Sequence, residues 1–510
     1  MSDTATSQTS AAPASAASSV TDAPKPRATE NRSTTPASSA FTAYIGSGWA
    51  DRTEPVPTPR SAVATAAAHR AEISRRHPGK RIIVPAGAPK QRSNDTDYPY
   101  RAHSGFTQLT GWGSDAEPGS VLVLEPADDG HEATLYFRER AGRDSDEFYA
   151  NPEIGEFWIG PRPSLAQVSG DLALPTRHIS ELQGVLDAVD ADTLVLREAD
   201  AALTADIVAL RSALSRDGDL TEADAELARD LSELRLTKDA WEVAQLRAAV
   251  DATAKGFDDI VRELPTIADH SRGERIIEGV FNARARLEGN TVGYDTIAAS
   301  GPHACILHWT RNDGPVRPGD LVLIDAGVEV DSLFTADITR TLPVSGRFTE
   351  TQRMVYEAVR EAADAAFAIV RPGIRFREVH ATAMQVIARR VAEWGMLPVT
   401  AEEALQADQG QHRRYMVHGT SHHLGLDVHD CAQARRDFYM DGIVEAGMTF
   451  TIEPGLYFQP DDLTVPEEFR GIGVRIEDDI LVTETGAENL SIGIPRTADD
   501  VEEWIARLQG

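Results

Sequence analysis

Apolar residues in the first half of the chain fall into short runs that alternate with amphipathic stretches. Residues 62–76 carry apolar side chains at helical spacing before His77-Pro78-Gly79 ends the pattern, which predicts a helix. Compact aliphatic runs predict strands at 81–84, 120–124, 134–137 and 193–197. A second helical pattern follows them and predicts a helix at 201–214. Such alternation of helices and strands is typical of an α/β domain.

The second half of the chain repeats one order of elements. Thr237 is the predicted N-cap of a helix that ends before Pro265, and Thr349 with Gln352 forms a capping-box pattern at the start of another. The predicted elements are helices at 238–264 and 275–287, strands at 291–298 and 321–324, helices at 350–371 and 379–394, and strands at 447–452 and 473–476. This repetition predicts a duplicated domain whose halves bring strand ends together around one site. We therefore expect a mixed α/β (α+β) fold.

Residues 1–40 differ from the rest of the chain in composition. They are rich in Ala, Ser, Thr and Pro and contain almost no large apolar side chain, which predicts a disordered low-complexity tail. We expect an N-terminal domain over 41–234, where no phosphate-binding glycine loop occurs, and a second domain over 235–510.

The composition narrows the classes of partner. There are 50 basic and 80 acidic residues, a formal net charge of −30, which argues against binding to nucleic acid or to an anionic membrane. The two cysteines, Cys305 and Cys431, imply no disulfide framework and favour a reducing compartment. No apolar run reaches the length of a membrane span. We expect a cytoplasmic protein.

Two acidic residues stand at the ends of extended apolar segments. Asp325 follows the apolar run at 321–324, and Asp337 lies between Ala336 and Ile338. A carboxylate beside a buried strand is costly unless a positive group pairs with it, and Arg340, the one basic residue nearby, comes after the second acid. A divalent metal ion would suit these oxygen ligands. Two ordinary solvated acids near a hairpin would give the same pattern.

Further candidate ligands follow in the second half. The segment HGTSHHLGLDVHD contains four histidines, His418, His422, His423 and His429, and imidazole both binds divalent metals and exchanges protons near neutral pH. Glu453 ends an apolar segment before Pro-Gly, and Glu477 interrupts the apolar run that follows Gly471. Four strand-borne carboxylates with one histidine predict a dinuclear metal site. The competing interpretation is that the histidines pack in the core and that each of the four buried acids has a separate partner that compensates its charge.

Taken together, the motifs IDAG, ADITR, HGTSHHLGLDVHD, TIEPGLY and GVRIEDD resemble the motif set of the pita-bread metallopeptidases of family M24B, and among them that of the Xaa-Pro aminopeptidases. Upstream, NDTDYPYR and FTQLTG resemble the creatinase-like N-terminal domain that these enzymes share. The resemblance implies metal ligands at Asp325, Asp337, His422, Glu453 and Glu477.

The same resemblance implies further site residues. It places functional histidines at His308, His418 and His429, and residues that line the substrate site at Tyr457 and Arg475. Asp95 matches an acid that, in tetrameric relatives, approaches a neighbouring subunit's site. The resemblance leaves the role of His423 open, and we expect this side chain to line the substrate site or to be solvated. Two manganese ions are the expected cofactors, with cobalt or zinc as substitutes.

The activity implied is hydrolysis of the N-terminal Xaa-Pro bond of peptides by a metal-bridging hydroxide. Glu453 is expected to move the proton of the attacking water, with His418 or His429 stabilising the oxyanion. The expected partners are peptides with proline in second position, and the expected assembly is a homodimer or homotetramer. A prolidase limited to dipeptides is one alternative, disfavoured by the short spacing between the last two glutamates. A non-catalytic pita-bread binding module is another, disfavoured because all five ligand positions are filled.

Overall fold

The computed structural model describes residues 35–36, 38–94, 96–214 and 221–510, and contacts divide the chain into two compact units. Unit 1 consists of residues up to Thr58 with Pro78–Tyr100 and Glu117–Asp224. Unit 2 consists of Pro59–His77, Arg101–Ala116 and Ala225–Gly510. The tail expected at 1–40 lies largely outside the described residues, and the boundaries expected at 41–234 and 235–510 stay predictions.

Unit 1 is built on a five-stranded mixed sheet of order β6-β5-β4-β1-β7. Its strands are β1 (Ile82–Pro85), β4 (Val121–Ala127), β5 (Gly130–Phe137), β6 (Thr176–His178) and β7 (Leu194–Val195), with a separate hairpin of β2 (Gln91–Ser93) and β3 (Thr96–Asp97). Its helices are α1 (Ser39–Ile45), α4 (Glu156–Ile159), α5 (Leu165–Leu172), α6 (Leu182–Leu186) and α7 (Ala201–Leu214). The strands predicted at 81–84, 120–124, 134–137 and 193–197 are confirmed, as is the helix at 201–214.

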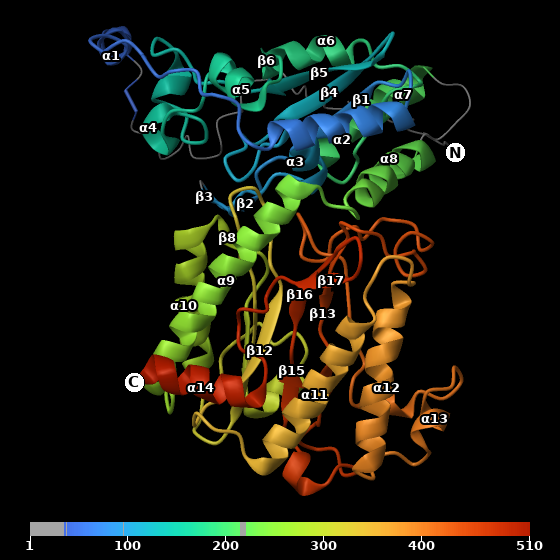
Figure 1. The fold of residues 1–510 in the computed structure, drawn as a ribbon. Helices are drawn as coiled ribbons and strands as arrows, with labels where there is room; N and C mark the ends of the chain where they lie inside the picture. The colour runs from blue at the N-terminus through green and yellow to red at the C-terminus, as the bar shows by residue number, and fades with distance from the viewer. Residues whose placement is uncertain (1–34, 37, 95, 215–220) are drawn as a thin grey trace, which may run out of the picture. The chain divides into compact units, whose positions relative to one another are not determined.

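Unit 2 holds helix pairs and short antiparallel sheets (Figure 1). The helices are α2 (Val63–Arg76), α3 (Ser104–Thr110), α8 (Thr221–Leu234, which starts in unit 1), α9 (Ala240–Ile267), α10 (Gly273–Glu288), α11 (Glu350–Ala368), α12 (Arg377–Glu393), α13 (Ala401–Ala404) and α14 (Ala498–Gln509). The strands are β8 (Thr291–Val292), β9 (Ile297–Ser300), β10 (Leu321–Ala326), β11 (Val328–Glu329), β12 (Ile338–Pro343), β13 (Thr449–Ile452), β14 (Gly455–Tyr457), β15 (Gly473–Arg475), β16 (Asp478–Val482) and β17 (Ala487–Asn489).

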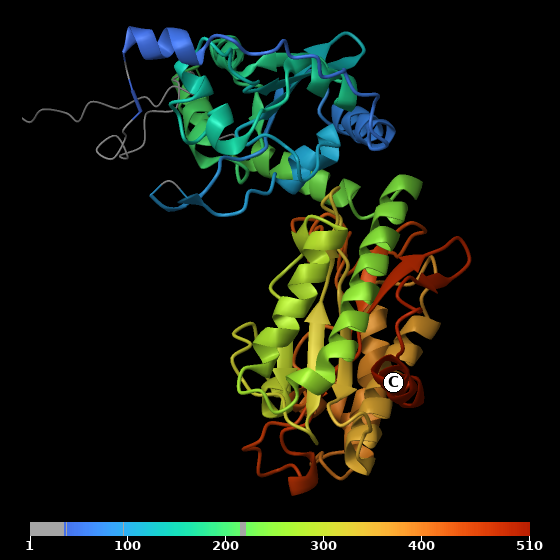
Figure 2. The ribbon, with the colours of Figure 1, turned by 90° about the vertical axis from the view of Figure 1, so that its left-hand side faces the viewer.

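The two halves of unit 2 match in their parts, as the sequence repeat predicts. Each half has a helix pair, α9–α10 or α11–α12, followed by one three-stranded and one two-stranded sheet: β12-β10-β9 with β11-β8, and β13-β16-β17 with β14-β15. Both helix pairs cover the strands, as Figure 1 and the turned view of Figure 2 show. One continuous apolar core joins the halves. Within the described residues, no helix combines the length and apolar character needed to cross a bilayer.

Three sequence predictions in unit 2 are wrong in detail. The N-cap of α9 is Asp239, which forms a capping box with Glu242, while Thr237 pairs with Met448 in an isolated bridge. Pro265 lies inside α9, which continues to Ile267. A proline cannot donate to the carbonyl four residues back, and that carbonyl, on Val261, accepts from the Gln509 side chain instead (3.1 Å).

The strand predicted at 291–298 is also wrong, because it is two strands, β8 and β9, with a loop between them. Gly293 ends β8 where the chain comes against Thr335. A Cβ on Gly293 would lie 1.9 Å from Thr335 Oγ1, so no larger residue fits this approach. The loop matters for function because it turns Tyr294 and Asp295 toward a pocket.

Candidate active site

Each of the five predicted metal ligands comes from a strand end or a loop that pairs with a strand. Asp325 belongs to β10, Asp337 directly precedes β12, Glu453 directly follows β13, and Glu477 lies between β15 and β16. His422 is held beside β13, because its carbonyl accepts from Thr451 N (2.9 Å). Thus segments that lie up to 152 positions apart deliver their polar groups to one place.

The ligand atoms of these residues form three overlapping groups in which all atoms lie within 4.8 Å of one another. The groups are Asp325, Asp337 and Glu477; His422, Glu453 and Glu477; and Asp337, His422 and His429. Asp337, His422 and Glu477 each belong to two groups. The structure therefore brings all five residues together, with two neighbouring positions at which a cation could be held.

The electrostatics of this cluster favour bound cations. Asp325, Asp337 and Glu477 are buried and Glu453 is half-buried. Burial, together with the neighbouring carboxylates, raises the pKa of Glu477 well above its ordinary value. Burial likewise raises the pKa of Asp337, although the hydrogen bond with His422 opposes it. Burial raises the pKa of Glu453 to about 7 against the charges of His422 and Arg475.

His422 responds to the same negative field. Burial lowers the pKa of His422, but its contact with Asp337 (3.2 Å) and the charge of Glu453 outweigh burial and raise it to about 9. The negative field of the buried carboxylates thus favours a positive group at this place. Four carboxylates and one imidazole are also the oxygen and nitrogen donors that divalent Mn, Co and Zn accept. The donor set therefore fits two divalent ions.

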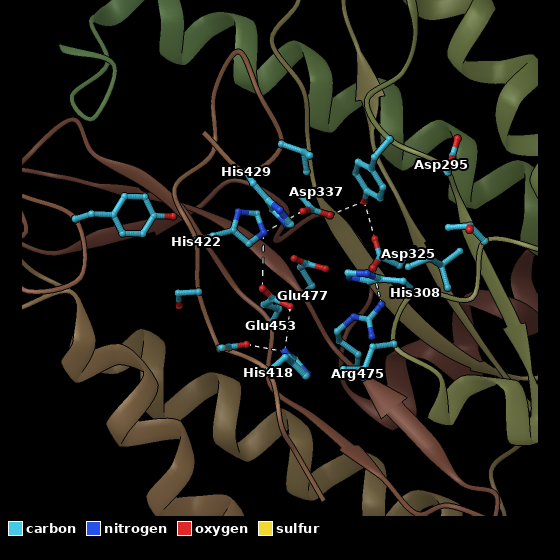
Figure 3. A pocket seen from close by; sticks show the side chains of 18 residues that line it. Asp295, His308, Asp325, Asp337, His418, His422, His429, Glu453, Arg475 and Glu477 are labelled. Atoms are coloured by element: carbon cyan, nitrogen blue, oxygen red, sulfur yellow. Dashed lines mark hydrogen bonds and ion pairs between the residues drawn. The ribbon is translucent and has the colours of Figure 1, made fainter. Parts of the chain in front are cut away.

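A pocket of about 750 Å³ opens onto the cluster. Figure 3 shows the labelled carboxylates and histidines converging in it. Its wall includes all five candidate ligands and the predicted histidines His308, His418 and His429. His429 packs edge-on against His422, with ring centroids 4.3 Å apart. The three histidines that the sequence predicted thus line the same pocket as the ligands.

Tyr457 and Arg475 form a buried layer next to the pocket. Arg475 lines the pocket, contacts Asp325 and donates to Thr339 Oγ1 and the Tyr457 hydroxyl (both 3.1 Å). The Tyr457 hydroxyl also lies 2.8 Å from His418 Nε2. Burial, which outweighs the charge of Arg475, raises the pKa of Tyr457 to about 12, so the hydroxyl keeps its proton. Arg475 therefore links a candidate ligand to a candidate catalytic histidine through Tyr457.

Comparison with known proteins assigns the family. The family model for metallopeptidase family M24 matches residues 244–484, and the model for the aminopeptidase P N-terminal domain matches residues 66–195. Xaa-Pro aminopeptidase 2 of Streptomyces coelicolor is 51% identical over 475 residues, which cover 93% of this chain and 97% of that protein. The chain belongs to metallopeptidase family M24, among the Xaa-Pro aminopeptidases.

More distant Xaa-Pro aminopeptidases support the same family assignment. The Xaa-Pro aminopeptidase of Escherichia coli is 34% identical over 440 residues, covering 84% of this chain and 94% of that protein. A solved structure of an Escherichia coli aminopeptidase P variant in complex with substrate superposes with a TM-score of 0.75 at 31% identity, covering 89% of this chain and all of that one. The expected pita-bread fold is confirmed, and membership of this metallopeptidase family implies divalent metal ions.

Sequence reasoning missed Tyr294, which lies against two of the candidate metal ligands. Its hydroxyl donates to Asp325 Oδ1 (2.6 Å) and contacts Asp337. Burial and the adjacent carboxylates raise the pKa of Tyr294 well above its ordinary value. The signal available in the sequence was Gly293, which breaks the strand predicted there.

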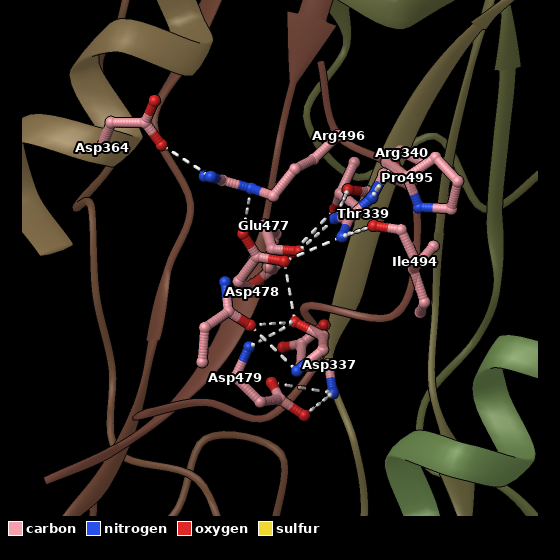
Figure 4. A network of polar contacts seen from close by, with 12 residues as sticks. Asp337, Thr339, Arg340, Asp364, Glu477, Asp478, Asp479, Ile494, Pro495 and Arg496 are labelled. Atoms are coloured by element: carbon pink, nitrogen blue, oxygen red, sulfur yellow. Dashed lines mark hydrogen bonds and ion pairs between the residues drawn. The ribbon is translucent and has the colours of Figure 1, made fainter. Parts of the chain in front are cut away.

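Sequence reasoning also missed a buried network behind the ligands (Figure 4). Arg340 is fully buried and donates to the carbonyls of Glu477 (2.7 Å) and Thr339 (2.9 Å) and to Asp478 (2.8 Å). Asp479 accepts from Asp337 N (3.2 Å). These contacts fix the backbone of the segments that carry Asp337 and Glu477.

Two further sequence candidates lie elsewhere. His423, whose role the sequence left open, is 1% exposed and stacks on Phe376 with ring centroids 4.6 Å apart. Burial lowers the pKa of His423 to about 3, so its ring is neutral. His423 therefore packs in the core, and the expectation that it is solvated or lines the substrate site is wrong. Asp95 lies outside the described residues.

Proposed function

We propose that this chain removes the N-terminal residue from peptides that carry proline in second position, using two divalent ions. The observation that carries the proposal is the set of three overlapping ligand groups, each within 4.8 Å, in the wall of one pocket. Asp325 would hold one ion and His422 with Glu453 the other, while Asp337 and Glu477 would contact both. Asp337 and Glu477 take the shared positions because each belongs to two groups and, unlike the imidazole of His422, offers two ligand oxygens.

Bound ions of this kind lower the pKa of a water molecule and polarise the scissile carbonyl. The side chains around them handle protons and charge. Glu453 takes the proton of the attacking water and passes it to the proline nitrogen that leaves. His418 lies 3.6 Å from Glu453, and His308 and His429 line the same pocket. Donors at these positions stabilise the oxyanion that develops on the carbonyl.

The charge of the pocket wall supports peptides longer than a dipeptide. Arg475 is the single arginine or lysine among the residues that line the pocket in the described part of the chain, and it is already paired with Asp325. An Xaa-Pro dipeptide places a free carboxylate next to the proline ring. A buried carboxylate needs a cation, whereas an amide at that position does not. A prolidase is the alternative that the test below addresses.

The finer assignments rest on the donor set and on the resemblance. We propose manganese as the ion, with cobalt or zinc as substitutes, because four carboxylates and one imidazole suit all three. We propose a homodimer or homotetramer, and in a tetramer the resemblance implies that Asp95 approaches a neighbouring subunit's site. We also propose that Tyr457 supports the proline site, since it contacts His418 and Arg475 but does not itself line the pocket. Metal analysis of the purified protein and its mass in solution test the ion and the assembly separately.

The central test measures release of the first residue from an Xaa-Pro-Pro tripeptide and from an Xaa-Pro dipeptide, with and without added manganese. Asp337→Ala is the matched control, since it removes a ligand that belongs to two of the three groups. We expect metal-dependent cleavage of the tripeptide that Asp337→Ala abolishes. Cleavage of the dipeptide alone would move the assignment to a prolidase. Cleavage of neither substrate by a folded, metal-loaded protein would refute the proposal and favour a binding module.

A further inference from the structure

Arg413 and His380 form hydrogen bonds to the loop 417–420, and neither residue lines the pocket. We call these two residues the clamp. The loop carries His418, and the two residues next to His418 pack little, since Val417 is 64% exposed and Gly419 is exposed. A segment with few apolar contacts depends on hydrogen bonds for its position. The loop nevertheless has to hold His418 within reach of Tyr457 and Glu453.

Arg413 and His380 supply these hydrogen bonds. Arg413, in the turn Gln411–Arg414, donates through Nη2 to the carbonyls of Val417 and His418, the latter at 2.9 Å. Its Nη1 donates to His380 Nε2. An arginine nitrogen can only donate, so this contact makes His380 Nε2 an acceptor.

The state of His380 follows from that contact. Burial and the charge of Arg413 lower the pKa of His380 to about 4, which leaves the ring neutral. With Nε2 accepting, the proton of the neutral ring is on Nδ1. His380 Nδ1 therefore donates to Thr420 Oγ1 (2.8 Å). Arg413 thus fixes the tautomer that His380 needs in order to hold Thr420.

Thr420 transmits this position to the proposed catalytic glutamate. It is fully buried, and its carbonyl accepts from Glu453 N (2.8 Å). Arg413 therefore holds the carbonyl of His418, and His380 holds Thr420, whose carbonyl pairs with the Glu453 amide. The side chains of His418 and Glu453 act in proton transfer or charge stabilisation in the proposed function.

We propose that Arg413 and His380 are positioning residues that set His418 and Glu453 for the chemical step. The proposal rests on the proposed function for its kinetic part. A misplacement of about 1 Å at a catalytic group lowers a rate by up to about 100-fold. Neither residue lines the pocket, so their loss is expected to lower kcat and leave KM nearly unchanged.

The kinetic experiment compares Arg413→Ala with Arg414→Ala. Arg414 lies in the same turn but pairs with Asp462 at the surface, so it controls for loss of a charge there. We expect kcat to fall roughly 10- to 100-fold in Arg413→Ala and to stay within about twofold in Arg414→Ala. Arg413→Lys, which keeps one donor, should recover part of the loss. Equal effects of the two alanine variants would overturn the proposal.

A double-mutant cycle separates positioning from general stability. If Arg413 acts partly through His418, Arg413→Ala should cost clearly less in a His418→Ala background than in the wild-type chain, because coupled residues are not additive. An undiminished cost would overturn the role assigned to Arg413. His380→Asn keeps a donor near Nδ1, and His380→Gln keeps an acceptor near Nε2. We expect His380→Asn to retain more activity, since it preserves the contact with Thr420.

A structural measurement does not depend on the reaction. Amide hydrogen exchange in the wild type, Arg413→Ala and Arg414→Ala is followed for peptides that cover residues 415–424 and 449–456. We expect faster exchange at the Glu453 amide and its neighbours in Arg413→Ala alone. Unchanged exchange would refute the clamp whatever the enzyme hydrolyses. Faster exchange in a protein whose wild type cleaves no Xaa-Pro peptide would retain the clamp and refute the proposed function.

Discussion

Replacing Glu242 with glutamine alters a buried titratable group at the start of α9. Glu242 is 3% exposed, and its Oε2 accepts from Asp239 N (2.9 Å) within the capping box. Burial raises the pKa of Glu242 to about 7, against the opposing effects of the Asp239 hydrogen bond and of Lys238. The neighbouring His69 is no counterion near neutral pH, because burial lowers its pKa. Glutamine keeps the oxygen that the capping box requires.

The sign and size of the effect follow from proton linkage. The pKa of Glu242 rises from an ordinary 4.5 to about 7 on folding, so between these values the folded state binds the proton more tightly. The contribution of Glu242 to the free energy of unfolding is therefore fully present below about pH 4.5 and is lost as the pH rises through about 7. At roughly 1.4 kcal/mol per pKa unit, the loss amounts to about 3 kcal/mol.

The assay is denaturant unfolding of the wild type and Glu242→Gln at pH 5.5 and pH 8.5, followed through the transition that includes unit 2. We expect the variant to gain about 2 kcal/mol relative to the wild type between these pH values, because only the wild-type carboxyl group ionises. Glu403→Gln is the matched control, since Glu403 forms the same capping box in α13 but is exposed. A constant difference between wild type and Glu242→Gln, or a larger change in Glu403→Gln, would refute the reasoning.

Three further variants test the site. Tyr294→Phe should weaken divalent-ion affinity about 10- to 100-fold, because Asp325 loses an orienting donor; calorimetric titration checks this, and unchanged affinity contradicts it. Glu453→Gln should lower kcat at least about 100-fold, measured by steady-state peptide cleavage, whereas a wild-type rate would exclude Glu453 as the proton carrier. Arg340→Met should destabilise the protein by about 1 to 3 kcal/mol, because the carbonyl of Glu477 would lose a buried donor while Asp478 keeps Arg496 as a partner; urea unfolding that matches the wild type would argue against that role of Arg340.

Local patterns in the sequence determined most secondary structure. Helix α7 begins and ends where the apolar spacing predicts, and the capping box of Thr349 with Gln352 marks the start of α11. These features depend on neighbours within a few positions, and such short-range chemistry is visible in the order of residues. The predicted C-terminal end of α9 was wrong for the opposite reason. The acceptor freed by Pro265 is satisfied by Gln509, which lies 248 positions from Val261.

The sequence also determined the family and the identity of the candidate ligands, because acids and histidines stand out on apolar segments. The residues that support them do not stand out. Tyr294 and Arg340 acquire their roles through contacts with strands that are distant in the chain. The same holds for Arg413 and His380, which lie 33 positions apart and meet only after α12 packs beside the loop.

What the tertiary structure alone decided is how the charges of the site are balanced. From the sequence, Asp325, Asp337, Glu453 and Glu477 are four acids on separate segments. Antiparallel pairing and the packing of the two halves bring these acids within a few ångströms of one another. Burial then disfavours their charges, so the folded chain pairs them with protons, with Arg475 or with metal ions. That choice depends on distance and solvent exclusion, which only the folded chain possesses.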